Sequence, residues 1–173
     1  MQKFIKSLTL YIIFSGLVLT FSCNKKEEPE IRTFEDELVE LDAMLDKRIE
    51  AGYDIKTTMG VYYIVLADGE GPNPDTGDTC YIEYKLHLQN GKLIKRSHDY
   101  NTSGIIKFLL GATGIPYMTP GWENGIRKMN KDAEFEFIIP SNLGYGDKGT
   151  SEIPPFTTLI YRTKMHDLRP KEK

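Results

Sequence analysis

Three short stretches of the chain place aromatic side chains among glycines and prolines, a composition that suits ligand binding better than covalent chemistry. Gly121–Ile126 contains the only tryptophan, Trp122. Ile139–Gly146 holds Tyr145 between small residues, and Glu152–Leu159 carries two consecutive prolines. Because glycine lets another chain approach the backbone closely, Trp122 and Tyr145 are candidates for lining a pocket. The alternative is that these aromatic residues only fill a core.

The composition excludes several other kinds of site. The chain has 22 basic against 25 acidic side chains, a net charge of −3, so we expect no strong positive field and no nucleic-acid partner. Two cysteines cannot build a disulfide framework or a Cys-based zinc cluster. The three histidines lack ligand spacing, so we expect neither a metal nor a cofactor.

Most of the chain after Gly60 has the pattern of β-strands. Val61–Ala67 is rich in β-branched and aromatic residues. Thr79–Leu88 alternates apolar and polar residues, which predicts a half-buried strand with Tyr84 facing inward. Asn-Gly within Gln89–Lys92 predicts a hairpin turn. The further strands that we expect are Leu93–Ser97, Ile105–Leu110, Glu134–Ile139 and Thr157–His166.

One short helix is expected inside this β region. Thr119 is suited to cap it, Pro120 suits its first turn, and Gly121–Met129 would form its body. Phe135 and Phe137, on the strand that follows, are expected to be core residues. The pattern therefore predicts an α+β domain, an antiparallel sheet wrapped around one short helix.

A second helix is expected at Thr33–Gly52, before the β region. Thr33 is positioned to cap its free amides, and acidic residues follow at the positive end of its dipole. We interpret its apolar stripe as a face that docks onto the domain, the alternative being a face that binds a partner. The stripe consists of Phe34, Leu38, Leu41, Leu45 and Ile49.

The first 22 residues resemble a secretory signal. Two lysines precede the apolar run Leu8–Phe21, which is short for a membrane span of about 20 residues. Cys23 directly after this run resembles the acylated first residue of a bacterial lipoprotein, anchored by lipid to the cell envelope. The alternative is a plain signal peptide with an incidental cysteine. We expect residues 23–32 to form a charged tether, either on the periplasmic face or at the cell surface. Cys80 is expected to be a buried thiol.

The order and spacing of these stretches carry a family resemblance. Together with Gly77–Thr79 and Phe108–Gly111, the three stretches resemble the FKBP-type peptidyl-prolyl cis-trans isomerases over Gly60–Leu168. The resemblance implies a half-wrapped antiparallel sheet curled around one helix, as residues 60–168, with a polar tail at 169–173. It also implies a shallow pocket that takes the proline of a polypeptide substrate, and no cofactor.

The resemblance assigns roles to individual residues. Trp122 would form the floor under the proline ring, and Tyr145 would donate a hydrogen bond to a substrate carbonyl. Thr119 would offer its main-chain amide. The catalytic positions implied are Tyr84, Trp122 and Tyr145. The substrate-binding positions implied are Ile94, Phe108, Met118, Thr119, Ile153 and Tyr161.

Such a pocket suits rotation about an Xaa-Pro bond. The barrier to rotation is about 18–20 kcal/mol because amide resonance is broken, and uncatalysed exchange takes tens of seconds or longer. An apolar aromatic cage and directed hydrogen bonds can hold the twisted amide in preference to the planar one, without a nucleophile or a metal.

Two residues of the pocket depart from the family pattern. Ile94 stands where the family has Phe, and Lys95 stands where it has Asp, so an acceptor is replaced by a donor. We expect Lys95 to extend toward solvent on its long stem. Two hypotheses follow: a prolyl isomerase that assists folding of envelope proteins, with a rapamycin-type macrolide as possible ligand, or an FKBP-like binding or chaperone module with little turnover.

Overall fold

The structure is a computed structural model that describes residues 32–112 and 118–172. The elements run in the order α1 (Phe34–Glu50), β1 (Lys56–Thr58), β2 (Val61–Ala67), β3 (Thr79–Leu88), β4 (Leu93–Arg96), η1 (Ser97–Asp99), β5 (Ile106–Leu109), α2 (Pro120–Ile126), β6 (Glu134–Ile139), η2 (Ser141–Leu143) and β7 (Leu159–Arg169).

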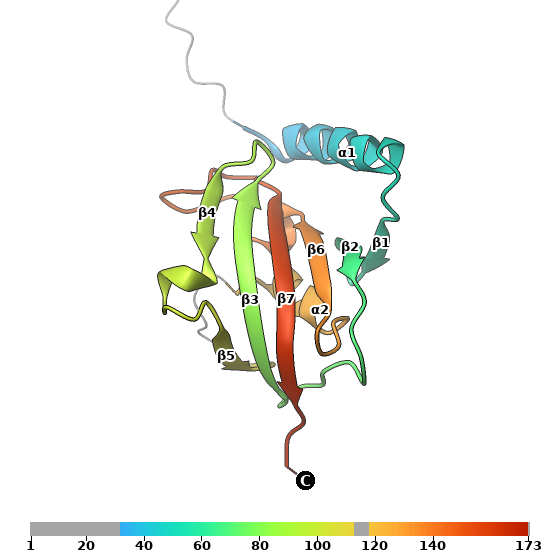
Figure 1. The fold of residues 1–173 in the computed structure, drawn as a ribbon. Coiled ribbons are helices and arrows are strands. Elements are labelled where there is room, and N and C mark those ends of the chain that lie inside the picture. Colours follow the sequence, from blue (N-terminus) through green and yellow to red (C-terminus); the bar gives the residue numbers. More distant parts are fainter. Residues whose placement is uncertain (1–31, 113–117, 173) are drawn as a thin grey trace, which may run out of the picture. The chain divides into compact units, whose positions relative to one another are not determined.

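The strands form one seven-stranded antiparallel sheet in the order β1-β2-β6-β7-β3-β4, with β5 also paired to β3 (Figure 1). β4 and β5 share one edge of β3: Lys85 lies opposite Arg96 of β4, and Ile82 lies opposite Ile106 of β5. The hairpin predicted at Asn90-Gly91 connects β3 to β4, and the Gly91 amide donates to the Leu88 carbonyl at 2.9 Å. The architecture is the expected α+β fold.

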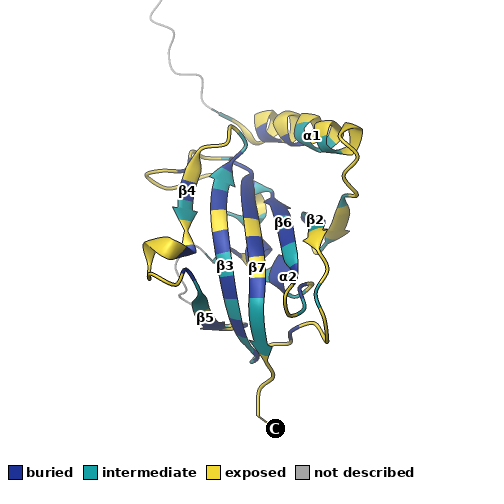
Figure 2. Ribbon diagram, in the orientation of Figure 1, coloured by how far each residue is buried: buried dark blue, intermediate teal, exposed yellow. Residues whose placement is uncertain are grey.

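Burial alternates along the two central strands, as Figure 2 shows for β3 and β7. The inner face carries Tyr84, Tyr161 and Thr163, each at most 1% exposed. It packs into one apolar cluster that includes α2. Cys80 belongs to this face, so the predicted buried thiol is confirmed, and burial raises its pKa to about 12.

Two glycines let α2 lie close against β6. A Cβ at Gly121 would stand 2.3 Å from Ile139 Cγ2, and one at Gly125 would stand 2.6 Å from the Phe137 ring. The glycines around Trp122 therefore serve helix–sheet packing, which differs from the expectation that they admit a ligand. Thr119 caps α2 as predicted, its hydroxyl accepting from the Trp122 amide at 3.3 Å.

α1 forms with the predicted cap at Thr33, in a reciprocal capping box with Asp36. Its buried face differs from the prediction, however. The only buried residues of α1 are Glu37 and Leu41, whereas Phe34, Leu38 and Ile49 are 38%, 41% and 59% exposed. Ser141 and Thr158 donate hydrogen bonds to the Glu37 carboxylate, which turns that side of the helix toward the domain. Most of the apolar stripe therefore faces outward.

Other expectations differ in extent or lie outside the described residues. β1 was not predicted, and α2 ends at Ile126 rather than Met129 because the amides of Lys128 and Met129 form tighter i−3 bonds.

The signal, Cys23 and most of the tether lie outside the described residues. Within 32–112 and 118–172, no helix is both long and apolar enough to cross a membrane.

Candidate active site

The inner face of the sheet brings three of the predicted pocket aromatics into direct contact. The Trp122 indole stacks on the Tyr161 ring, with centroids 4.8 Å apart and planes inclined by 15°. Tyr84 meets the indole edge-on at 4.7 Å and lies 5.8 Å from Tyr161. Residues from β3, α2 and β7, far apart in sequence, therefore form one aromatic cage. Aromatic pairs at such separations prefer offset-stacked or edge-to-face geometry, which this cage adopts.

A residue that the sequence analysis did not single out fixes the orientation of the indole. Thr163 is fully buried on β7, and its hydroxyl accepts the Trp122 Nε1–H at 2.9 Å. The sequence could have indicated this residue, because Thr163 is two positions from Tyr161 on β7 and therefore lies on the same face of the strand. The bond satisfies the polar end of an otherwise apolar floor.

Hydroxyl groups gather at one side of the cage. Burial raises the pKa of Tyr161 well above its usual value, and the nearby Tyr145 and Tyr84 hydroxyls raise it further, as does a hydrogen bond with Tyr145. A hydrogen bond with Thr119 acts in the opposite direction. The Tyr161 phenol is therefore held in its neutral form, next to the Tyr145 hydroxyl that is predicted to donate to a substrate carbonyl.

The other predicted site residues adjoin the same cluster. Ile94, Phe108 and Ile153 are buried in it at 8%, 6% and 1% exposure, and Met118 and Tyr145 pack against it half-buried. The register of β5 modifies one assignment, because Phe108 pairs with Cys80 while Ile106 pairs with Ile82, two residues from Tyr84. Ile106, which the sequence analysis did not single out, also packs against the cluster.

Lys95 lies opposite the buried Leu86 in the register of β3 and β4, and its side chain is 28% exposed. Ile94 faces inward, and the Lys95 ammonium lies 4.0 Å from Asp99 Oδ2 and 5.3 Å from the centroid of the Tyr100 ring. The position at which the family carries an acid therefore holds a cation that contacts Asp99 and the Tyr100 ring.

The cage is closed in this structure. Trp122 is 1% exposed and Tyr161 covers one face of the indole. The indole is therefore almost fully covered by its neighbours.

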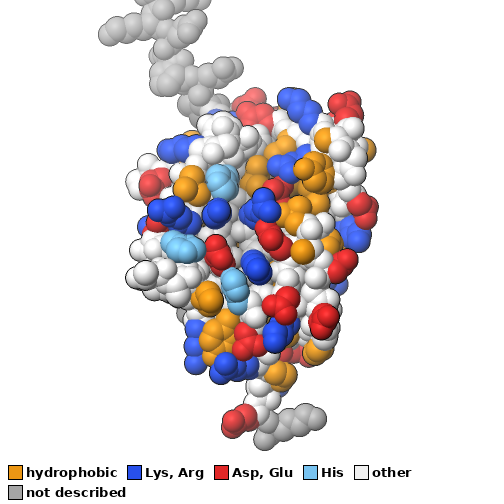
Figure 3. All heavy atoms as spheres, in the orientation of Figure 1, with side chains coloured by type: hydrophobic (Ala, Val, Ile, Leu, Met, Phe, Trp, Pro, Cys, Tyr) orange, Lys and Arg blue, Asp and Glu red, His pale blue; other side chains and the backbone are white. Residues whose placement is uncertain are grey.

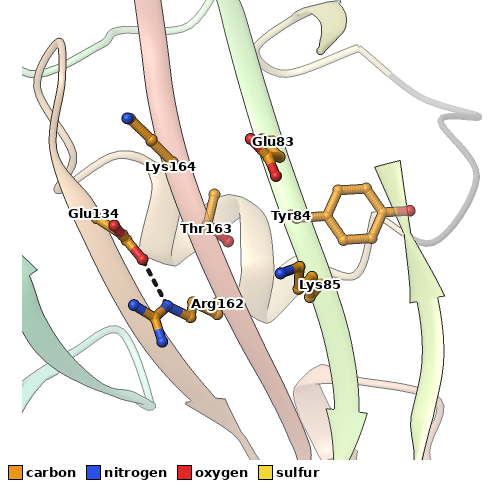
Figure 4. A pocket seen from close by; sticks show the side chains of 7 residues that line it. All are labelled: Glu83, Tyr84, Lys85, Glu134, Arg162, Thr163 and Lys164. Atoms are coloured by element: carbon orange, nitrogen blue, oxygen red, sulfur yellow. Dashed lines mark hydrogen bonds and ion pairs between the residues drawn. The ribbon is translucent and has the colours of Figure 1, made fainter. Parts of the chain in front are cut away.

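The outer face of the same strands has the opposite character. Figure 3 shows basic and acidic side chains intermixed over β3 and β7. A polar hollow of about 150 Å³ lies there (Figure 4), and Glu134 accepts from Arg162 at 2.6 Å across part of it. The residues lining it are Glu83, Tyr84, Lys85, Glu134, Arg162, Thr163 and Lys164.

Two histidines come together on this outer face, contrary to the expectation that none cluster. His98 Nδ1 and His166 Nε2 lie 3.9 and 3.3 Å from the two carboxylate oxygens of Glu83. Among residues 32–112 and 118–172, however, no group of three potential ligands is arranged to hold a metal ion.

Comparison with known proteins identifies the family. A family model described as FKBP-type peptidyl-prolyl cis-trans isomerase matches residues 71–166, more than half of the 173-residue chain. The chain belongs to the FKBP-type peptidyl-prolyl cis-trans isomerase family. The FKBP match includes Tyr84, Trp122, Tyr145 and Tyr161, the residues that form the cage and its hydroxyl edge.

Individual FKBP relatives support this assignment. The chain is 32% identical over 124 residues to the Escherichia coli isomerase FkpA, covering 72% of this chain but only 43% of FkpA. The crystal structure of FkpA superposes with a TM-score of 0.63 at 28% identity, over 80% of this chain and 63% of that one. An isomerase from Pseudomonas syringae pv. tomato gives 0.64 at 25% identity, over 80% of this chain and 97% of that one. The chain thus spans less than half the length of FkpA itself.

Proposed function

We propose that the protein is a peptidyl-prolyl cis-trans isomerase whose active site is the aromatic cage of Tyr84, Trp122 and Tyr161. The observation that carries the proposal is the contact of these three rings beside the Tyr145 hydroxyl, in a chain of the FKBP family. The cage is apolar and buried, so a hydrogen bond made inside it is stronger than one made in water.

The mechanism follows from the two parts of the site. The rings receive the proline side of the substrate and exclude water, which favours the twisted amide because it is less polarised by resonance than the planar one. Tyr145 donates to a substrate carbonyl, and Met118, Thr119 and Ile153 contact the chain on either side of the proline. No covalent intermediate forms, since only rotation is required.

A matched pair of tyrosine variants tests this function. In a protease-free assay on an Xaa-Pro peptide, Tyr145→Phe should lower kcat/KM about tenfold, the value of one well-placed hydrogen bond. Tyr100→Phe is the control, because Tyr100 is 43% exposed and lies on the surface beside Lys95. Equal losses in both variants would argue against a catalytic role for Tyr145.

We further propose that the clients are proline-containing polypeptides of the cell envelope and that acylated Cys23 anchors the protein to a membrane. The support is the apolar run followed by Cys23 and a charged tether. Mass spectrometry of the Cys23 peptide should show attached acyl chains. The Cys23→Ser variant should leave the membrane fraction, and its retention there would contradict the anchor.

A second candidate function is a binding or chaperone module with little turnover. Two observations favour it: the indole is 1% exposed, and Ile94 and Lys95 replace pocket residues of the family. Trp122 fluorescence separates the two candidates. A rapamycin-type macrolide or a proline peptide that shifts the fluorescence without accelerated isomerisation would favour the binding module.

A further inference from the structure

Glu37 is a carboxylate of α1 that is entirely removed from solvent, at 0% exposure. Its Oε1 atom accepts hydrogen bonds from the Ser141 amide and the Thr158 hydroxyl, both at 2.7 Å, and its Oε2 atom accepts from the Ser141 hydroxyl. A buried carboxylate is costly unless such donors surround it. Since Ser141 and Thr158 lie outside α1, these bonds join the helix to another part of the domain.

Ser141 and Thr158 stand at the two ends of residues 141–158, here called the rim segment, which carries Tyr145 and Ile153. The Ser141 carbonyl accepts from the amides of Gly144 and Gly146, both at 2.8 Å, so it holds the backbone on either side of Tyr145. One carboxylate on α1 therefore reaches the backbone around the predicted catalytic hydroxyl through a single intervening residue.

The chain leading into α1 holds the far end of the rim segment. Phe156 has a φ of +50°, a strained value for a bulky residue that persists only where the surroundings enforce it. Arg32 Nε donates to the Phe156 carbonyl at 2.9 Å, and the Phe34 ring lies 6.5 Å from that of Phe156. Arg32 is itself fixed by two bonds to Glu40, at 2.8 and 2.5 Å.

The space between these anchors is partly empty. A hollow of about 410 Å³ lies beside the rim segment, lined by Arg32, Glu40, Leu88, Gln89, Asn90, Pro154 and Thr157. The polar bonds of Glu37 and Arg32 therefore connect α1 to the rim segment beside this hollow, together with the contact between the Phe34 and Phe156 rings.

We propose that α1 is a clamp on the rim segment and that Glu37 is a positioning residue of the proline site. Glu37 acts through Ser141 and Thr158 and holds Tyr145 and Ile153 where a substrate chain meets them. The effect on turnover rests on the proposed isomerase function, whereas the effect on the rim segment does not.

Three variants of one helix test the clamp. Glu37→Leu removes the acceptors and should lower kcat/KM about tenfold. Glu37→Gln keeps an acceptor oxygen for the Ser141 amide and should recover most of that loss. The control is Glu35→Leu, an exposed position on the same helix, which should stay within about twofold of the wild type.

Amide hydrogen exchange supplies a readout that does not need turnover. In Glu37→Leu the Gly144 and Gly146 amides should exchange faster, while amides of β3 and β7 keep their protection. If Glu37→Leu does not fold, Ser141→Ala removes one donor only and should give the same pattern. Wild-type exchange at Gly144 and Gly146 in a folded variant would overturn the clamp, even if the wild-type protein proves to have no isomerase activity.

A double-mutant cycle with Tyr145→Phe tests the route of the effect. If Glu37 acts by positioning Tyr145, the combined loss in kcat/KM should be smaller than the product of the two separate losses. Independent, fully multiplicative losses would contradict this route and assign Glu37 a general structural role.

Discussion

The two faces of β3 and β7 share one backbone ladder and yet have opposite chemistry. On the inner face Tyr84 and Tyr161 are at most 1% exposed and contact an indole, whereas on the outer face Glu134 and Arg162 form an ion pair in contact with water. Charges on the outer face are screened by solvent and contribute little. Hydrogen bonds on the inner face operate where water is excluded, so their loss is costly. The comparison supports the proposal that the directed hydrogen bonds of catalysis lie on the inner face.

Neighbouring residues on β7 give the largest expected contrast between the faces. Tyr161→Ala should destabilise the fold by about 3–5 kcal/mol, because it removes a large ring from the cage. Arg162→Ala should cost less than about 1 kcal/mol, since it breaks only a surface ion pair. Urea unfolding of both variants measures the difference, and similar midpoints would show that the cage does not hold the core together.

Thr163 and Lys164, the next two residues of β7, give a smaller contrast in stability between the two faces. Thr163→Val conserves volume but leaves the Trp122 Nε1–H without its acceptor, which should cost about 1–3 kcal/mol. Lys164→Ala, on the outer face, should change stability by no more than about 0.5 kcal/mol. Urea unfolding and the Trp122 emission maximum report on both variants. An unchanged emission in Thr163→Val would mean that the bond does not orient the indole.

The buried thiol of Cys80 on the inner face makes the stability of the fold depend on pH. Burial raises the pKa of its thiol from 9.0 to about 12, so the folded state keeps a proton that the unfolded chain releases. Its contribution to stability is therefore complete below pH 9 and is lost as the pH rises toward 12. By pH 10 the total loss relative to neutral pH should be about 1.4 kcal/mol. Cys80→Ala should lack this component in denaturant titrations, and identical pH profiles would contradict the burial.

The smallest effect is expected at Lys95, which stands where the family carries an acid. Lys95→Asp restores the acid found in the family, and turnover should be preserved or rise by about twofold, because an acceptor replaces a donor at that position. The protease-free assay measures this. A clear fall in turnover would place Lys95 within the working site.

Much of the fold was predictable because local patterns determine it. Alternation located β3, the Asn-Gly turn closed the hairpin, and Thr119 marked the start of α2. β1 was not predicted because it is a polar strand of three residues that forms only through its pairing with β2. Strand order did not follow from periodicity, since it depends on contacts between distant segments.

The site was predictable in part. The cage aromatics followed from the family motifs, whereas Thr163 and Glu37 did not, because buried polar residues are recognised by their partners and not by local pattern. The same limit explains why the apolar stripe of α1 was a poor guide to the side of the helix that is buried.

The rate of cis–trans isomerisation of an Xaa-Pro peptide, measured without protease on the protein starting after Cys23, tests the central claim most directly. The inner-face account predicts acceleration over the spontaneous rate that saturates with peptide, accompanied by a change in Trp122 fluorescence over the same concentration range. A rate indistinguishable from the spontaneous one would contradict the assignment of the aromatic cage as a catalytic site.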